Sequence, residues 1–314
     1  MNRVRRTLED FFGLFADHNL LYRFKSHVAA EYQSLSNEIL QSVLRDPILH
    51  VDETVVHLGW GQAGYVWVLT SLDKAYYFYK PSREISFLHQ MLTPFTGILV
   101  SDFYPAYDVL ACKQQKCLVH LVRDIDDDLL RNPMDGELKT FAAEFGRLLR
   151  EIIQTVDRYG LKSRHLRKHK RVVSRFLKSV VSSDFTSELA DKYKKRFQKS
   201  GTKMFTFLDH DGIPWNNNNA EHAIKRFAKY RRMADGQFTE RTLKEYLVLA
   251  TVFETCEFNN VNVLKFLLSK ETTLAGLFKM ARRKVDANFH KPENAPLPMS
   301  DALPQGFDRA IDLV

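Results

Sequence analysis

The sequence predicts an α/β protein in which a mixed sheet of five strands is combined with helices. Three observations support this fold class. Short runs rich in β-branched and aromatic residues occur between residues 50 and 119, helical periodicity dominates residues 121–199, and two further helical patterns follow residue 214. The long helical stretch is therefore predicted to be an insertion between the fifth strand and the last helix of the core.

The first three strands are predicted to form an antiparallel meander. Residues 50–58, 65–70 and 75–79 are rich in Val, Thr, Tyr, Phe and Trp, the residue types that favour a pleated, half-buried surface. The three glycines within residues 59–64 predict a tight turn between the first two strands. Strands joined by such short connections pair as neighbours.

Helices separate the remaining strands. Residues 97–102 form a short apolar run that is typical of a buried strand, and residues 116–119 are predicted to be a fifth strand. Short helices are expected at residues 85–92 and 104–110. Three strands, helix, strand, helix, strand and a late helix is the element order of the ribonuclease-H-like fold.

This order divides the chain into five segments. The last segment has four prolines after Arg282 and few large apolar residues, so a loose extension is expected there. The predicted boundaries are a helical lead-in at 1–46, the first part of the core at 47–120, the helical insertion at 121–213, the last core helices at 214–270 and a C-terminal extension at 271–314.

The charge distribution predicts a polyanionic partner. The chain carries 46 Lys and Arg against 38 Asp and Glu, a net charge of +8. Residues 162–178 contain eight Lys or Arg and no acid, and further basic clusters occur at 192–199 and 225–232. Clustered positive charge on separate segments favours nucleic acid over a membrane surface, although a solvated basic surface remains an alternative.

The sequence has the features of neither a secreted protein nor a membrane protein. The basic N-terminus is followed by Glu9, Asp10 and Asp17, which does not fit a secretory signal, and no uncharged apolar run approaches the roughly 20 residues of a membrane helix. Three cysteines are too few for a disulfide framework. A cytoplasmic protein without a membrane partner is expected.

Three acids occupy positions that suit two-metal phosphoryl chemistry. Asp52 is predicted midway along the first strand, Asp102 at the end of the fourth, and Glu221 in the first turn of a late helix. Such chemistry needs carboxylate oxygens from separate elements to converge on metal ions about 3.5–4 Å apart. For any one acid, a surface carboxylate or a cap is the alternative explanation; Glu221 would also complement the helix dipole.

Four consecutive asparagines precede the helix that carries Glu221. One asparagine is enough to cap a helix, so the additional amides of residues 216–219 are interpreted as contacts to DNA or as groups that support the acids. Ala220, Ala223, Ile224 and Phe227 are expected to form the packed stripe of this helix, with Glu221 beside it.

Four motifs together resemble one known family. They are His50-Val51-Asp52-Glu53-Thr54, Ser101-Asp102-Phe103-Tyr104-Pro105-Ala106-Tyr107, Cys117-Leu118-Val119-His120 and Asn217-Asn218-Asn219-Ala220-Glu221. In this order over residues 7–270, they are similar to the insertion-sequence-sixty-six transposase family. The resemblance implies a catalytic Asp-Asp-Glu triad of Asp52, Asp102 and Glu221 that holds Mg²⁺ or Mn²⁺, and the cut-and-join movement of a mobile DNA element.

The same resemblance assigns a role to His120. Cys117 and His120 are similar to a Cys/Asp-x-x-His signature in which the histidine lies close to the scissile phosphate. A zinc site is the weaker alternative, because Cys112, Cys117 and His120 supply three possible ligands without an evident fourth. His222 stands where many members of the family have Arg, and Lys225 where Arg is common.

The predicted partner is double-stranded DNA, both at the ends of the element and at the target. A homo-oligomer within a DNA complex, helper proteins of the same element, and association with the bacterial nucleoid are further expectations. A truncated or repurposed, non-catalytic DNA-binding relative is the alternative function. The residues expected to contact DNA are Asn217, Asn218, Lys225, Arg226, Lys229, Arg231, Arg232, Lys168 and Arg171.

Overall fold

A computed structural model describes residues 2–234 and 238–287 and divides them into two compact units. The first unit comprises the described residues of 1–95 and 218–291, and the second comprises residues 96–217. The chain therefore leaves the first unit after the early strands and returns to it for the last helices. Asp52 and Glu221 belong to the first unit, and Asp102 belongs to the second.

The first unit contains the antiparallel meander that the sequence predicts. It consists of β1 (Ile48–His57), β2 (Ala63–Thr70) and β3 (Ala75–Lys80). The turn between β1 and β2 depends on glycine, because Gly61 has a φ of 79°, a backbone conformation that side chains disfavour. Gly64 leaves room for the ring of Tyr79, which a Cβ atom at this position would overlap.

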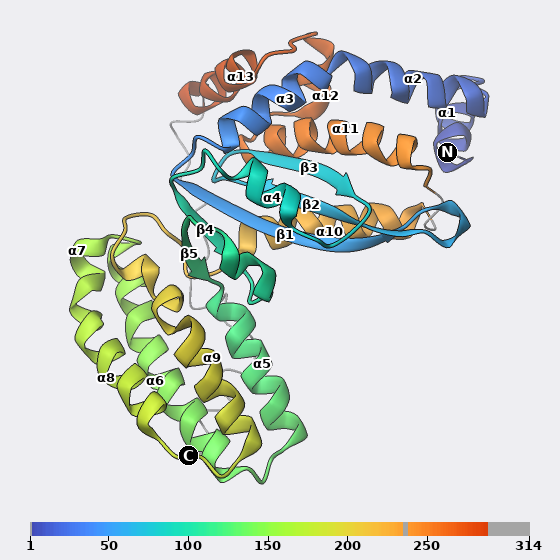
Figure 1. The fold of residues 1–314 in the computed structure, drawn as a ribbon. Helices are drawn as coiled ribbons and strands as arrows, with labels where there is room; N and C mark the ends of the chain where they lie inside the picture. Colours follow the sequence, from blue (N-terminus) through green and yellow to red (C-terminus); the bar gives the residue numbers. More distant parts are fainter. Residues whose placement is uncertain (1, 235–237, 288–314) are drawn as a thin grey trace. The chain divides into compact units, whose positions relative to one another are not determined.

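Helices cover the meander on both faces and along one edge (Figure 1). The face that carries Val56, Val66 and Val68 packs on α10, and the other face packs on Phe87 of α4, whose ring meets Trp67 edge-on at 5.2 Å. The helices of this unit are α1 (Asn2–Phe12), α2 (His18–Glu31), α3 (Gln33–Val43), α4 (Ser86–Met91), α10 (Asn218–Met233), α11 (Glu240–Phe258), α12 (Val263–Leu268) and α13 (Leu274–Ala287).

Helix α11 supplies hydrogen-bond acceptors to the backbone N–H groups on the outer edge of β3. The backbone N–H of Tyr77 donates to Oγ1 of Thr251 at 3.0 Å, and the N–H of Ala75 donates to Oγ1 of Thr255 at 3.2 Å. An exposed strand edge is a template for unwanted pairing. Two buried threonine hydroxyls close this edge instead.

The second unit combines two parallel strands with a helical bundle. Strands β4 (Ile98–Ser101) and β5 (Lys113–Lys116) pair in parallel. The bundle is built around aromatic side chains of three helices, where Phe141 and Phe145 contact Phe176 and Phe197. Its elements are η2 (Pro105–Val109), α5 (Leu118–Arg131), α6 (Gly136–Tyr159), α7 (Ser163–Leu166), η3 (Arg167–His169), α8 (Lys170–Ser182), α9 (Glu188–Met204) and η4 (Thr206–Leu208).

The predicted α/β class with a mixed five-stranded sheet is confirmed, with the strand order β3-β2-β1-β4-β5. The predicted position of the fifth strand is wrong. Residues 116–119 were expected to form it, but β5 ends at Lys116 and Leu118 begins α5. The apolar run after Lys116 is buried as a helix, and periodicity cannot separate the two states over so few residues. The helix expected at 104–110 is the short 3₁₀ segment η2.

Part of the expected C-terminal extension is helical. Helix α13 packs against α3, and its Leu274 and Leu277 are buried, while residues 288–314 lie outside the described residues. Among the helices of the described ranges, none has the length and apolar character needed to cross a bilayer.

Candidate functional site

Asp52 lies on the face of β1 that packs against α10. Side chains alternate along a strand, so Asp52 shares its face with Thr54 and Val56. Val56 belongs to the apolar cluster that includes Ala220 and Ala223 of α10. Asp52 is half-buried, and its Oδ1 accepts a hydrogen bond from the backbone N–H of Glu53 at 2.9 Å. The carboxylate therefore sits on the α10 side of the meander.

Glu53, the neighbouring acid of the same motif, has a structural role. Its side chain is on the opposite face of β1, where Oε1 accepts hydrogen bonds from Nε of Arg83 at 2.8 Å and from Nη2 at 2.5 Å. Only 4% of the Glu53 side chain is exposed. A buried carboxylate with a guanidinium partner is satisfied within the fold, so Asp52 is the candidate functional acid of this motif.

Glu221 is buried in the first turn of α10. Ala220, Ala223 and Phe227 form the packed stripe predicted for this helix, and Glu221, 8% exposed, lies beside it. Nζ of Lys225, one turn further on, lies 3.5 Å from Oε2 of Glu221. Because α10 covers the face of the meander that carries Asp52, the structure places Asp52 and Glu221 on the same side of the first unit.

Hydrogen bonds with β3 and with the β2–β3 turn hold α10 in place. The hydroxyl of Tyr77, on β3, donates to the carbonyl oxygen of Ala223 at 2.9 Å, and this contact is buried. Nδ2 of Asn219 donates to the carbonyl oxygen of Ser71, in the β2–β3 turn, at 3.2 Å. These contacts sit on either side of Glu221 in sequence and therefore fix the turn that carries it.

A buried acid on α11, Glu254, provides a further anchor that was not predicted from the sequence. Nη1 of Arg226 lies 3.2 Å from Oε2 of Glu254 and also pairs with Glu257, and Nδ1 of His222 lies 3.9 Å from Oε1 of Glu254. Burial raises the pKa of Glu254 against the opposing effect of Arg226, and burial together with Arg226 lowers the pKa of His222. The signal in the sequence was the spacing of Glu254 from Leu247 and Thr251, which places an acid on the buried stripe of α11.

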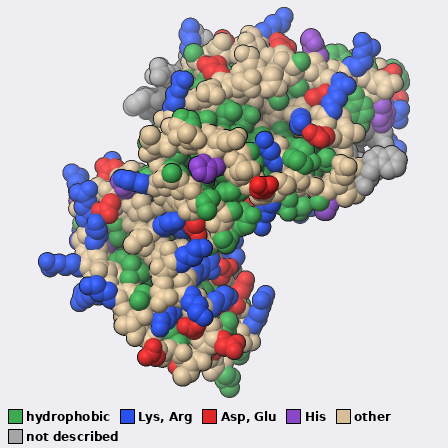
Figure 2. All heavy atoms as spheres, in the orientation of Figure 1, with side chains coloured by type: hydrophobic (Ala, Val, Ile, Leu, Met, Phe, Trp, Pro, Cys, Tyr) green, Lys and Arg blue, Asp and Glu red, His purple; other side chains and the backbone are tan. Residues whose placement is uncertain are grey.

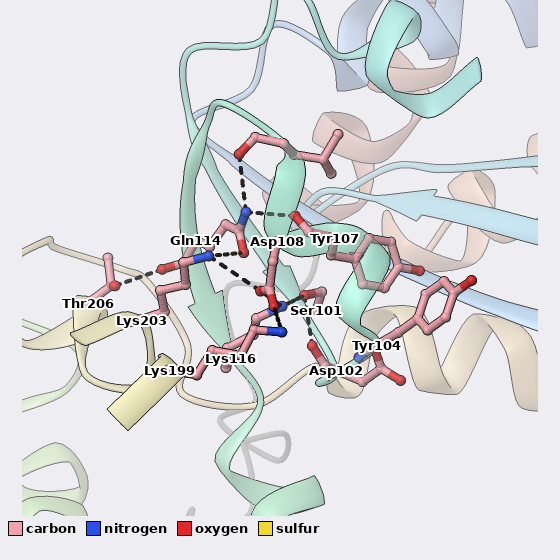
Figure 3. Close-up of polar contacts among 11 residues, drawn as sticks. Ser101, Asp102, Tyr104, Tyr107, Asp108, Gln114, Lys116, Lys199, Lys203 and Thr206 are labelled. Carbon is pink, nitrogen blue, oxygen red and sulfur yellow. Dashed lines mark hydrogen bonds and ion pairs between the residues drawn. The ribbon is translucent and has the colours of Figure 1, made fainter. Parts of the chain in front are cut away.

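In the second unit, Asp102 immediately follows β4 (Figure 3). Its Oδ1 accepts a hydrogen bond from the backbone N–H of Tyr104 at 2.9 Å. This closes a turn in which an aspartate side chain binds the backbone two residues further on. Asp102 is half-buried, so the strand end and the turn orient its carboxylate while leaving part of it accessible.

A buried lysine supports this strand end, and it too was not singled out in the sequence. Lys116 is paired with Ser101 across the parallel strands, and its Nζ donates to Oγ of Ser101 at 3.2 Å; that hydroxyl in turn donates to the carbonyl oxygen of Asp102 at 3.0 Å (Figure 3). Asp108 lies 3.2 Å from Nζ of Lys116 and 2.9 Å from Nζ of Lys199. Burial lowers the pKa of Lys116, and the negative charge of Asp108 acts in the opposite direction by raising it. The network connects the Asp102 turn to α9.

Cys117 and His120 lie close together at the start of α5. Cys117 is the N-cap residue of α5 and His120 is in its first turn. The prediction that Cys117 lies in the fifth strand, with His120 just after that strand, is therefore wrong. Sγ of Cys117 and a ring nitrogen of His120 lie within 4.8 Å of each other. Sγ also accepts a hydrogen bond from the backbone N–H of Asn217 at 3.2 Å.

Some of the residues expected to bind DNA are exposed, and others are buried or bound to other groups of the protein. Asn217 is fully buried, and its contact with DNA stays a prediction. Arg226 pairs with Glu254 and Glu257, and Nη1 of Arg231 donates to the carbonyl oxygen of Val55. The exposed members are Asn218, Lys225, Lys229, Arg232, Lys168 and Arg171.

These features define an α/β protein with acidic side chains on a strand, directly after a strand, and in the first turn of a helix. The chain belongs to the Transposase IS66 family, whose model matches residues 1–244. The predicted family is therefore confirmed.

One relative extends the comparison. It is the uncharacterized protein y4qI of Sinorhizobium fredii (strain NBRC 101917 / NGR234), 23% identical over 307 residues. The match covers 84% of this chain and 54% of the relative, so the chain spans about half the length of that protein.

Removal of the Tyr77 hydroxyl tests how firmly α10 is anchored. Tyr77→Phe is expected to lower the free energy of unfolding by about 1 kcal/mol, the net contribution of a typical buried hydrogen bond. The measurement is urea unfolding followed by circular dichroism. Tyr79→Phe is the matched control, since Tyr79 lies on the same strand face and its hydroxyl makes no hydrogen bond within the described residues. Equal losses in both variants would show that the Tyr77–Ala223 contact contributes nothing.

Proposed function

We propose that this chain is the catalytic part of a transposase, with a ribonuclease-H-like core that cleaves DNA strands and joins them to a target. Membership of the transposase family supports a DNA-processing role. The observation that carries the proposal is that the acids lie on different faces of the meander. Asp52 and Glu221 lie on the α10 side of the meander, whereas Glu53 is turned away and bound to Arg83.

The proposed metal site consists of Asp52, Asp102 and Glu221. Carboxylate oxygens are the donors that Mg²⁺ and Mn²⁺ prefer, and the partial or complete burial of these three side chains suits ligands held in fixed orientations. Bound Mg²⁺ or Mn²⁺ would supply charge stabilisation for the attacking and leaving oxygens. Asp52 and Glu221 belong to the first unit, and Asp102 belongs to the second.

The proposed reaction has two steps, a hydrolysis that leaves a 5′-phosphate and a transesterification that exchanges one phosphodiester for another. Water attacks a phosphorus atom, the bond to the 3′ oxygen breaks, and a 3′-hydroxyl is released. That hydroxyl then attacks a target phosphodiester, so one phosphorus–oxygen bond forms as another breaks. Neither step needs a nucleotide cofactor. The N–H of Tyr104 keeps the Asp102 carboxylate oriented, and the Tyr77 hydroxyl fixes the helix that carries Glu221.

On α10, three exposed cations are proposed to contact the DNA backbone beside the acids. Lys225, Lys229 and Arg232 are spaced by four and three residues, so they lie on one face of the helix and begin one turn after Glu221. Asn218 is exposed at the start of the same helix. Arg226 and Arg231 are assigned to holding the helix, because both contact other elements of the unit.

Isosteric replacement of the acids tests the triad. Asp52→Asn, Asp102→Asn and Glu221→Gln are each expected to reduce Mn²⁺-dependent nicking of supercoiled plasmid DNA to background while DNA binding is retained. The losses should be non-additive, because the acids act as one unit. Glu53→Gln is the matched control: the adjacent acid should affect stability through Arg83 but preserve nicking. Nicking by a triad variant at the wild-type rate would remove that residue from the site. Binding without nicking in the wild-type chain would favour a non-catalytic DNA-binding protein.

Metal binding is expected to stabilise the folded chain. At a hundredfold excess of metal over the dissociation constant, linkage contributes about 2.7 kcal/mol. Melting temperature is measured with millimolar Mg²⁺ or Mn²⁺ and with NaCl of equal ionic strength. The increase should be absent in the Asp52→Asn/Glu221→Gln double variant. An unchanged wild-type melting temperature, or an equal increase in the double variant, would contradict a preformed site at these acids.

His120 is proposed to assist at the scissile phosphate rather than to bind zinc. His120→Ala should slow nicking without reducing DNA affinity, and elemental analysis should find no stoichiometric zinc in either protein. His222→Ala, at an exposed imidazole on α10, is the control for the loss of a histidine. One zinc per wild-type chain that disappears in His120→Ala would reverse the assignment.

A further inference from the structure

The structure separates two basic clusters of the second unit that look alike in sequence. Helix α9 has six Lys and Arg, and each of them pairs with an acid. Lys192 lies 2.6 Å from Asp128, and Arg196 lies 2.6 Å from Asp124. The basic cluster at residues 192–199 is therefore neutralised within the bundle and adds little field to the surface.

The segment of η3 and α8 behaves differently. Four of its cations, Lys168, Arg171, Arg175 and Lys178, are exposed, and within the described ranges none of them makes an ion pair. They are spaced by three, four and three residues, so they follow one face of the helical rod. We call these four residues the α8 stripe. Figure 2 shows Lys and Arg side chains gathered on the α7–α8 side of this unit.

Cations of the same segment that lie off the stripe are paired. Nζ of Lys170 donates to both carboxylate oxygens of Asp209, at 2.8 and 2.9 Å, and Nε of Arg167 lies 3.8 Å from Oδ1 of Asp209. Basic residues of this segment can therefore pair with a nearby acid, whereas the four residues of the stripe form no ion pair with any described acid.

The opposite face of α8 is fixed in the core of the bundle. Val173, Phe176 and Val180 are buried, and the ring of Phe176 packs against Phe145 and Phe197. The stripe thus rests on a rigid support and leaves no apolar face of α8 for insertion into a lipid surface. A straight row of four cations on a rigid helix is complementary to an evenly spaced row of phosphates.

We propose that the α8 stripe binds the phosphate backbone of duplex DNA, as a docking surface on the helical unit that is separate from the carboxylates; the choice of DNA rests on the proposed function. Ten residues of helix span about 15 Å. Along the axis of duplex DNA, one strand presents a phosphate about every 3.4 Å. Laid along the DNA axis, the stripe therefore runs past four to five phosphates of one strand. Contacts of this kind position a protein on DNA without reading its sequence.

The experiment measures the affinity of the full chain for a labelled 30-base-pair duplex over a series of KCl concentrations, in EDTA so that no cleavage occurs. The test variant carries Lys168→Gln, Arg171→Gln, Arg175→Gln and Lys178→Gln. The matched control removes four charges from paired positions through Lys170→Gln, Lys192→Gln, Lys195→Gln and Lys199→Gln. Melting temperatures show that each protein is folded.

Each phosphate neutralised contributes about 0.9 to the slope of log affinity against log salt. The slope is therefore expected to fall by about 3 to 4 in the stripe variant and by less than 1 in the control, equally for duplexes of different sequence. Equal slope changes in both variants would overturn the proposal, because net charge alone would explain them. Tighter binding of duplex RNA than of DNA would also overturn it.

Two further arms keep the test decisive. If the fourfold variant does not fold, Arg175→Gln and Lys178→Gln are measured singly, and each should lower the slope by about 0.9; no change would overturn the proposal. A stripe effect on binding in a chain that never nicks DNA would sink the proposed function alone, and nicking without a stripe effect would sink this inference alone.

Discussion

The close packing of α10 on the meander is the constraint on which the first unit depends. Ala220 and Ala223 have side chains small enough to let the helix approach the strands, and Phe227 fills the space one turn further on. Once this stripe is buried, the position of Glu221 beside it follows from helix geometry. The carboxylate must then be tolerated in a nearly buried place, which costs free energy unless a cation or proton compensates it. Lys225 at 3.5 Å offsets part of that cost.

Charge in the second unit is distributed by a different rule. The bundle brings acids of several elements to the cations of α9, so most of the positive charge there is compensated. In the acid-free segment that ends in α8, the ion pairs within the described residues are those of Lys170 and Arg167 with Asp209. A net charge of +8 spread evenly would produce a weak field. Concentrated on a few uncompensated faces, it produces local potentials that attract polyanions.

The sequence predicted those elements whose side chains obey a simple period. Half-buried strands alternate, so β1 to β3 were evident, and α6 buries a regular apolar face. Strand β5 has the sequence Lys-Gln-Gln-Lys and escaped notice because its buried amides replace apolar side chains. Nε2 of Gln114 donates to the carbonyl oxygen of Tyr107, and Nε2 of Gln115 donates to that of Met204. Such contacts join residues up to 89 positions apart, so no local sequence pattern predicts them. The same holds for the contacts of Lys116 with Ser101 and Asp108.

The run of asparagines from residue 216 to 219 gains a physical explanation from the division of the chain. One unit ends at Asn217, and the other resumes at Asn218. Asn216 and Asn217 are buried in the second unit, where the N–H of Asn217 donates to Cys117, while Asn219 donates to the β2–β3 turn of the first.

At such a crossing the backbone has no regular partner, and its polar groups must still be satisfied. Amide side chains both donate and accept hydrogen bonds, so they can serve where a strand or helix cannot. A single asparagine would cap α10. In this run, the backbone N–H of Asn217 binds Cys117 in the second unit, and the side chain of Asn219 binds the β2–β3 turn of the first unit at the start of the helix that carries Glu221.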